Sequence, residues 1–216
     1  DQQALIGELG IRYELKNTLF KKYPSCGLTQ SSTAAILDLA NTYKFSAEDV
    51  AQINITVQPF VYNMVGNPYE IGDNPKLNAQ YNIPYCVANA LLNGDSKIIH
   101  FSEPFVTDAR TIAFSRKVKV TSDPASEGKG QMSAMNMEVI TRSGKTYSKS
   151  IVSAPGFPGN PLKEDEHMSR FRNCMDYSAG LLPAESIEKL IQIVNKLEYV
   201  EDVREIIALI TPTNIN

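Results

Sequence analysis

Alternation of apolar and polar residues predicts β-strands in the first three quarters of the chain. Isoleucines and valines alternate with polar residues from Ile53 to Val57, and Pro59 ends the run. The strands predicted in this way are Thr18–Tyr23, Ile53–Val57, Val118–Val120, Met135–Val139 and Thr146–Val152. Ser143-Gly144 separates the last two runs, which predicts a β-hairpin. We therefore expect an antiparallel sheet.

Apolar residues three and four positions apart predict helices between and after these strands. The predicted helices run from Ser31 or Ser32 as cap to Tyr43, from Ala79 to Asn93, from Phe105 to Phe114, from Glu164 to Tyr177, from Pro183 to Leu197, and from Val203 to Ile210. Ser46 to Asp49 has the capping pattern of a short helical turn, and Gly94 is a stop signal.

The order of these elements predicts an α+β fold, in which an antiparallel sheet with packed helices precedes an all-helical C-terminal segment. Prolines and glycines between Pro155 and Pro161 mark the change. We divide the chain into an entry segment at 1–16, an α+β domain at 17–155 and a helical segment at 156–216. The entry segment has apolar residues such as Leu5 but is interrupted by glycines.

Composition narrows the classes of function. The chain has 216 residues, 43% of them hydrophobic, and a net charge of −3, which favours neither nucleic acid nor an anionic membrane as partner. No apolar stretch approaches the roughly 20 residues of a membrane span. Three widely spaced cysteines argue against a secreted disulfide framework, so we expect a cytoplasmic protein. The amino terminus has no signal-peptide pattern and no initiator Met, so we expect a fragment or a processed product.

Familiar metal and phosphate motifs are missing from the sequence. His100 and His167 are the only histidines, and neither Cys-x-x-Cys nor His-Glu-x-x-His occurs, so we expect no metal site. His100 follows two isoleucines, which favours a structural role, and His167 belongs to a solvated first helical turn. Ser143-Gly144-Lys145-Thr146 resembles part of a phosphate-binding loop, but Val139 stands where that loop needs glycine.

Lys21 is the first candidate for chemistry, because it lies beside Pro24 at the end of a predicted strand. An ammonium group there can neutralise a substrate carboxylate or a developing enolate. The alternative is a solvated lysine on an edge strand, which composition alone favours. Lys22 faces the opposite way in a regular strand, so at most one of the two points inward.

Cys26 and Tyr85 are polar or titratable residues in apolar surroundings. Cys26 follows the proline turn and is either a thiol acid or base or an inert small hydrophobe. Tyr85 lies on a helix rich in Ala, Val and Leu, where its hydroxyl either donates to a substrate or reaches the surface from a packed ring. These groups converge with Lys21 only if the helix packs behind the turn.

Six segments, in order, resemble the MmgE/PrpD family. They are Leu9–Leu15, Lys21-x-Tyr23-Pro24-x-Cys26, Phe60-Val61-Tyr62, Ala79-Gln80-Tyr81, Pro84–Ala88 and Gly156-x-Pro158-x-Asn160-Pro161-Leu162. Members include 2-methylcitrate dehydratase, cis-aconitate decarboxylase and iminodisuccinate epimerase. They are cofactor-free enzymes of small polycarboxylates, usually homodimers, built from a large helical domain and a smaller α+β lid domain.

The resemblance covers only the lid and the C-terminal helices, and implies that an amino-terminal helical domain supplies most acid and base groups. It implies proton abstraction alpha to a carboxylate, followed by dehydration, decarboxylation or epimerisation. By resemblance Lys21 and Tyr85 are the catalytic candidates, while Cys26 and Gln30 are substrate-binding candidates. Gln30 stands where many members carry His, a departure that weakens a proton-transfer role for this part. The alternative function is a non-catalytic binding or assembly module that pairs with a separate helical partner.

Overall fold

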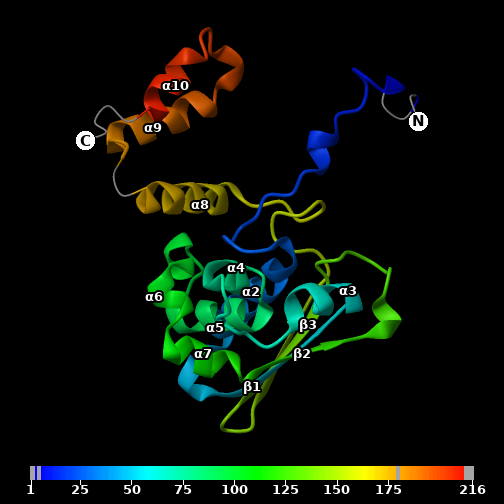
Figure 1. The fold of residues 1–216 in the computed structure, drawn as a ribbon. Coiled ribbons are helices and arrows are strands. Elements are labelled where there is room, and N and C mark those ends of the chain that lie inside the picture. Colours follow the sequence, from blue (N-terminus) through cyan, green and yellow to red (C-terminus); the bar gives the residue numbers. More distant parts are fainter. Residues whose placement is uncertain (1–2, 4–5, 179–180, 212–216) are drawn as a thin grey trace. The chain divides into compact units, whose positions relative to one another are not determined.

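The computed structural model describes residues 3, 6–178 and 181–211, and the chain divides into two compact units, Asp1–Lys163 and Glu164–Asn216 (Figure 1). Leu5, which was counted among the apolar residues of the entry segment, lies outside the described residues. The two units are described separately.

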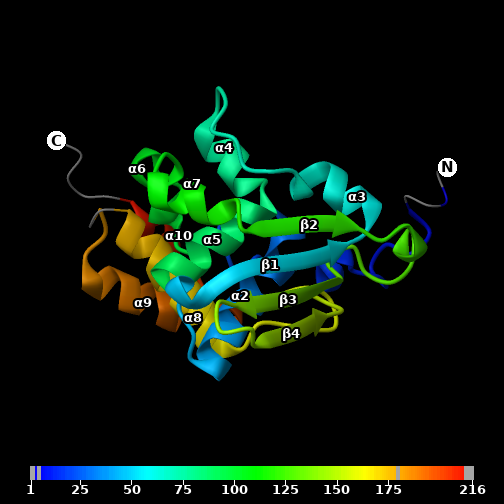
Figure 2. The ribbon, with the colours of Figure 1, turned by 90° about the horizontal axis from the view of Figure 1, so that it is seen from below.

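The first unit contains a four-stranded sheet made of β1 (Val50–Val57), β2 (Val118–Ser122), β3 (Met135–Thr141) and β4 (Thr146–Ile151). The strands lie in the order β2-β1-β3-β4 (Figure 2). β3 is antiparallel to both β1 and β4, as expected, but β1 and β2 are parallel. The α+β class is thus confirmed and the sheet is mixed. A parallel neighbour needs a long crossover, which the helices between β1 and β2 provide.

Helices cover one face of this sheet. The α-helices of the first unit are α2 (Gln30–Tyr43), α3 (Pro59–Val61), α4 (Pro75–Gln80), α5 (Ile83–Asn93), α6 (Glu103–Val106) and α7 (Ala109–Ser115). Shorter helical turns are Glu14–Asn17, Gly27–Thr29, Ala47–Asp49, Tyr62–Gly66, Ile98–Phe101 and Pro124–Ser126. α2 packs on β3 and β4, and α5 packs on β2, α2 and α7. Ile53, Ile55 and Val139 are fully buried beneath them, which confirms the alternation predicted for the strands.

The other face of the sheet is polar, and none of the labelled helices of the first unit lies on it (Figure 2). Its side chains bond to one another: Asn54 donates to Glu138 at 3.1 Å, and Ser150 donates to Asn136 at 2.6 Å. This division explains the alternation of the sequence, since only every second residue of each strand meets the helices.

Four local predictions were wrong. The helix predicted over Phe105–Phe114 is divided into α6 and α7, and Asp108 caps α7 by accepting the Thr111 N–H at 2.8 Å. Thr18–Tyr23 is not a strand and does not belong to the sheet, although the Phe20 N–H donates to the Gly156 carbonyl. The helix predicted over Ala79–Asn93 is interrupted at Tyr81-Asn82, where Asn82 caps α5 by accepting the Tyr85 N–H at 2.8 Å. α2 starts at Gln30, so the serines predicted as its cap are buried inside its first turn.

The second unit is helical, as predicted, and consists of α8 (Glu164–Tyr177), α9 (Ala184–Val194), the 3-10 turn Leu197–Tyr199 and α10 (Arg204–Ile210). An ion pair of 2.7 Å between Arg172 and Glu188 joins α8 to α9. Several apolar residues remain exposed: Val194, Leu197, Val203, Ile207 and Ile210. Within the described ranges, no helix has the length and apolar character needed to cross a membrane.

Candidate functional site

Two of the unusual segments of the sequence lie side by side in the first unit. The N–H of Phe20, just before Lys21, donates to the Gly156 carbonyl at 2.8 Å. The Gly156 N–H in turn donates to the Asn160 carbonyl at 2.8 Å, which closes the second turn on itself. The turn Lys21–Cys26 and the turn Gly156–Leu162 therefore form one junction.

Gly156 makes this junction possible. Its φ of +86° lies in the left-handed region that glycine tolerates and other residues avoid. A Cβ atom at this position would lie 1.9 Å from the Phe20 carbonyl oxygen, which is far inside van der Waals contact. The close approach of the two backbones therefore requires glycine.

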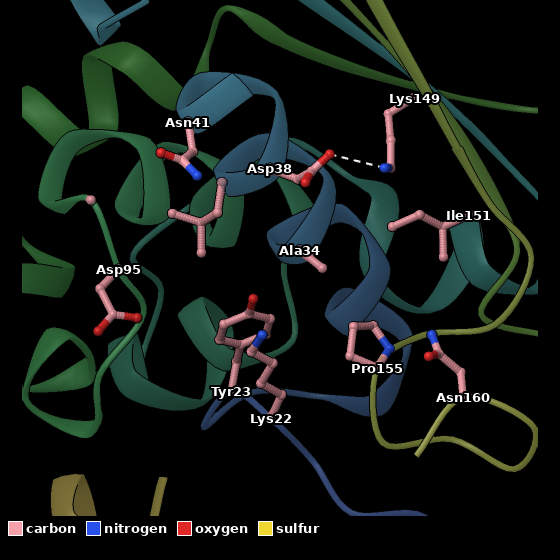
Figure 3. Close-up of a pocket in the computed structure, with 12 residues that line it drawn as sticks. Lys22, Tyr23, Ala34, Asp38, Asn41, Asp95, Lys149, Ile151, Pro155 and Asn160 are labelled. Carbon is pink, nitrogen blue, oxygen red and sulfur yellow. Dashed lines mark ion pairs between the residues drawn. The ribbon is translucent and has the colours of Figure 1, made fainter. Parts of the chain in front are cut away.

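An open hollow of about 620 Å³ lies beside the junction (Figure 3). We call it the cleft, and its polar walls are formed by Lys22, Tyr23, Asp38, Asp95, Lys149 and Asn160. Lys22 and Tyr23 come from the first turn and Asn160 from the second. α2 contributes Asp38 and β4 contributes Lys149. Asp95 comes from the segment that follows α5, directly after Gly94.

The charges of the cleft are arranged in a simple way. Lys149 Nζ lies 2.9 Å from Asp38 Oδ2 on one side of the cleft, and both side chains are about half exposed (Figure 3). Lys22 Nζ lies 5.7 Å from the centre of the Tyr23 ring, at the edge of cation–π range. The cleft also contains Asp95 and the Asn160 amide, whose Nδ2 donates to the Ser153 carbonyl at 2.8 Å and carries a second N–H. Ammonium and amide groups are the kinds of donor that bind a carboxylate.

Of the two neighbouring lysines, Lys22 lines the cleft, whereas Lys21 is exposed and is not among its lining residues. The sequence predicted that at most one of the two points inward and favoured Lys21. The expectation that at most one points inward rested on the alternation of a regular strand, which this segment is not, whereas the choice of Lys21 rested on its place beside the proline turn and on the family resemblance. No pattern in the sequence marked Lys22, Asp38 or Lys149 as cleft residues, because their elements meet only in the folded unit.

Gln30 and Cys26 lie behind the turn. The Gln30 side chain is fully buried, and its Nε2 donates to the Tyr23 carbonyl at 3.0 Å while its Oε1 accepts the Tyr23 N–H at 2.9 Å. Cys26 is partly buried against the core, and its N–H donates to the Gln80 carbonyl at 2.9 Å. The structure thus gathers Lys21, Cys26 and Gln30 around one turn.

Tyr85 does not join this group. Its side chain is fully buried in a separate cluster, between the rings of Tyr69 and Phe101 at centroid distances of 4.8 and 5.7 Å. Its hydroxyl donates to the His100 carbonyl at 2.6 Å, and burial raises the pKa of Tyr85 well above its ordinary value. Direct contact with a substrate would require this hydrogen bond to break.

Two further titratable groups belong to the interior. Burial raises the pKa of the Cys86 thiol to about 12, and its Sγ lies 3.5 Å from the Ala79 carbonyl oxygen. Burial lowers the pKa of His100, whose Nδ1 accepts the Lys97 N–H at 3.2 Å. Neither group is poised as an exposed nucleophile or base. Among the residues that the structure describes, no three His, Cys, Asp or Glu side chains form a group suited to a metal ion.

Comparison with known protein families and with curated proteins completes the description. No curated protein matches the chain. The model of the MmgE/PrpD C-terminal domain matches residues 23–199, which include the turn from Tyr23 onward, the whole sheet and the helices α8 and α9. This match agrees with the segments of resemblance from Tyr23 onward, whereas Leu9–Leu15 and Lys21 lie before the matched region. The chain belongs to the MmgE/PrpD family, and the matched region is its C-terminal domain.

Proposed function

We propose that the chain is the lid and C-terminal portion of a cofactor-free MmgE/PrpD-family lyase or isomerase that acts on a small di- or tricarboxylate. The observation that carries this proposal is the meeting of two family segments at one cleft, where the cationic Lys22 and the Asn160 amide face the same space. Charge-assisted hydrogen bonds from such groups are strong and suit a carboxylate.

In this proposal the chain binds and positions the acid, and Lys21 and Lys22 stabilise negative charge. Abstraction of a proton alpha to a carboxylate generates an anion, which nearby ammonium groups stabilise more than they stabilise the substrate. Cys26 lies behind the same turn as a weaker candidate for substrate contact. The base comes from the amino-terminal helical domain, which the family resemblance implies, and the complete enzyme is a cytoplasmic homodimer.

Tyr85 and Gln30 have different roles here from those that the resemblance implies. Both side chains are fully buried and hydrogen-bonded to backbone groups, Tyr85 to His100 and Gln30 to Tyr23. We therefore propose that Gln30 supports the site from behind and that Tyr85 stabilises the separate aromatic cluster.

An assay of reconstitution tests the proposal. The chain is assayed alone and together with the amino-terminal helical domain of a family member, against 2-methylcitrate, cis-aconitate and iminodisuccinate. We expect turnover of one acid by the combination and none by the chain alone. Turnover by the isolated chain would disprove the dependence on a second domain, and the absence of turnover and of binding for every acid would disprove the enzyme function.

A non-catalytic assembly module is the second candidate. The observation in its favour is the exposed apolar surface of the second unit, which includes Leu197, Ile207 and Ile210. This function predicts a stable complex with a helical partner that survives the change Lys21→Ala. A chain that sediments as a monomer and captures no partner would contradict it.

A further inference from the structure

We infer that Gln30 is a positioning residue, whose buried carboxamide holds the turn Lys21–Cys26 so that Lys21 and Lys22 are in place before a carboxylate arrives. This inference rests on the proposed function. It replaces direct contact between Gln30 and substrate with an action through the turn.

The geometry of the carboxamide carries the inference. Gln30 Oε1 accepts the Tyr23 N–H at 2.9 Å, and Gln30 Nε2 donates to the Tyr23 carbonyl at 3.0 Å. The side chain thus pairs with both backbone groups of one residue, as a neighbouring strand does in a sheet. Nε2 also lies 3.3 to 3.4 Å from three oxygen atoms of Ser25 and Cys26.

The chemistry of the position favours a carboxamide. It is neutral and carries one acceptor and two donor hydrogens at the end of the side chain. A carboxylate would place negative charge against several carbonyl oxygens, and an apolar side chain would leave the Tyr23 backbone groups buried without these partners. Gln30 is fully buried, so water does not compensate for either loss.

The two lysines lie between two fixed points. On one side Phe20 is held by its hydrogen bond to Gly156, and on the other side Tyr23 is held by Gln30. Beyond Tyr23, Gln80 Nε2 donates to the Pro24 carbonyl at 2.9 Å. Only Lys21 and Lys22 lie between these fixed residues, so the backbone that carries both ammonium groups has little freedom.

This arrangement matters for affinity. A mobile turn must lose conformational entropy when it binds a ligand, and this cost weakens binding. When the turn is already held by Gln30, that cost falls on folding and not on binding. The inference therefore predicts that Gln30 affects carboxylate affinity without touching the carboxylate.

The test compares Gln30→Met with a matched control in the same helix. Thr33 is also fully buried in α2, and its hydroxyl donates to the Thr29 carbonyl at 2.9 Å within the helix, so Thr33→Val removes a buried hydrogen bond away from the turn. The full chain and both variants are titrated with citrate by NMR, with hydrogen exchange at the Tyr23 amide and urea unfolding measured on the same samples. Should Gln30→Met fail to fold, Gln30→Asn keeps the amide one methylene shorter and takes its place.

We expect Gln30→Met to weaken citrate binding about tenfold and to speed exchange at the Tyr23 amide, while Thr33→Val loses stability without either effect. Equal citrate affinity in the unsubstituted chain and in Gln30→Met would overturn the positioning role and leave the carboxylate site intact. Equal losses of affinity in the two variants would also overturn it, because general destabilisation would then suffice. If the unsubstituted chain shows no saturable response to citrate, the proposed carboxylate site is disproved, and the positioning role is disproved with it.

Discussion

The turn Lys21–Cys26 and the helix α5 both place polar side chains in apolar surroundings, yet the two regions use them differently. The turn sends Lys22 to the wall of an open cleft and holds its own backbone with the buried amide of Gln30. α5 places Tyr85 in a buried aromatic cluster, where its hydroxyl donates to one backbone carbonyl. In this unit, therefore, the polar residue Tyr85 inside an apolar helix completes a core, whereas the polar residue Lys22 in a turn borders solvent.

The largest effect should come from the junction that holds the turn. Gly156→Ala adds a Cβ within 1.9 Å of the Phe20 carbonyl oxygen at a left-handed φ, so we expect a loss of more than about 3 kcal/mol in the free energy of unfolding. Gly159 has a similar φ of +83° with no atom within 4 Å of an added Cβ, which makes Gly159→Ala the matched control. Urea unfolding of both variants measures the difference, and equal losses would mean that the contact with Phe20 does not matter.

The aromatic cluster should give the next largest effect. Tyr85→Phe removes the hydroxyl and leaves the His100 carbonyl without that donor, so we expect a loss of about 1 to 2 kcal/mol in stability. Citrate affinity should stay unchanged, because Tyr85 is not among the residues that line the cleft and its hydroxyl is bonded to the His100 carbonyl. Tyr81→Phe, at an exposed tyrosine nearby in the chain, is the control for stability. A variant of full stability that loses citrate binding would restore Tyr85 as a substrate ligand.

Substitution of the two lysines tests which of them binds a carboxylate at the cleft. Lys22→Met should weaken citrate binding about tenfold, and Lys21→Met should weaken it less, because Lys22 lines the cleft and Lys21 is exposed. Neither change should alter stability by more than about 0.5 kcal/mol. Calorimetric titration with citrate ranks the two variants against Lys119→Met on the exposed edge of β2. The reverse ranking would favour the assignment that the family resemblance implies.

The smallest effect should be a dependence of stability on pH near the aromatic cluster. Burial lowers the pKa of His100 below 6.5, so the unfolded chain takes up a proton at a higher pH than the folded chain does. The contribution of His100 is therefore complete above pH 6.5 and decreases as the pH falls toward the folded-state value. His100→Gln should flatten the curve of stability against pH in that window. Identical curves for the unsubstituted chain and the variant would contradict the prediction.

Much of the fold could be predicted from local patterns. The alternation in β1 and β3, the hairpin at Ser143-Gly144 and the helix α8 all depend on neighbouring residues, and the structure confirms them. The parallel pairing of β1 with β2 escaped prediction because it depends on where the crossover helices pack. The segment before Pro24 resembles a strand in composition but has no neighbouring strand to complete it.

The site was predicted only in part, for the same reason. The motifs marked the turn Lys21–Cys26, and the structure places Gln30 against the backbone of that turn. Asp38 and Lys149 were missed, since α2 and β4 are far apart in the sequence and their ion pair exists only after folding. Tyr85 stood out because it is polar among apolar residues. A core tyrosine with a hydrogen-bonded hydroxyl and a tyrosine that binds substrate both give this pattern, so the pattern does not distinguish them.

The bond between Phe20 and Gly156 has a consequence for the order of folding. These residues come from opposite ends of the first unit, so the bond forms only after the sheet has brought those ends together. Closing so long a loop is costly in entropy, and a chain made from its amino terminus cannot close it before the Gly156 turn has been synthesised. The segment that carries the lysines is therefore made early and ordered late. A nascent chain would have its sheet core before it has a cleft.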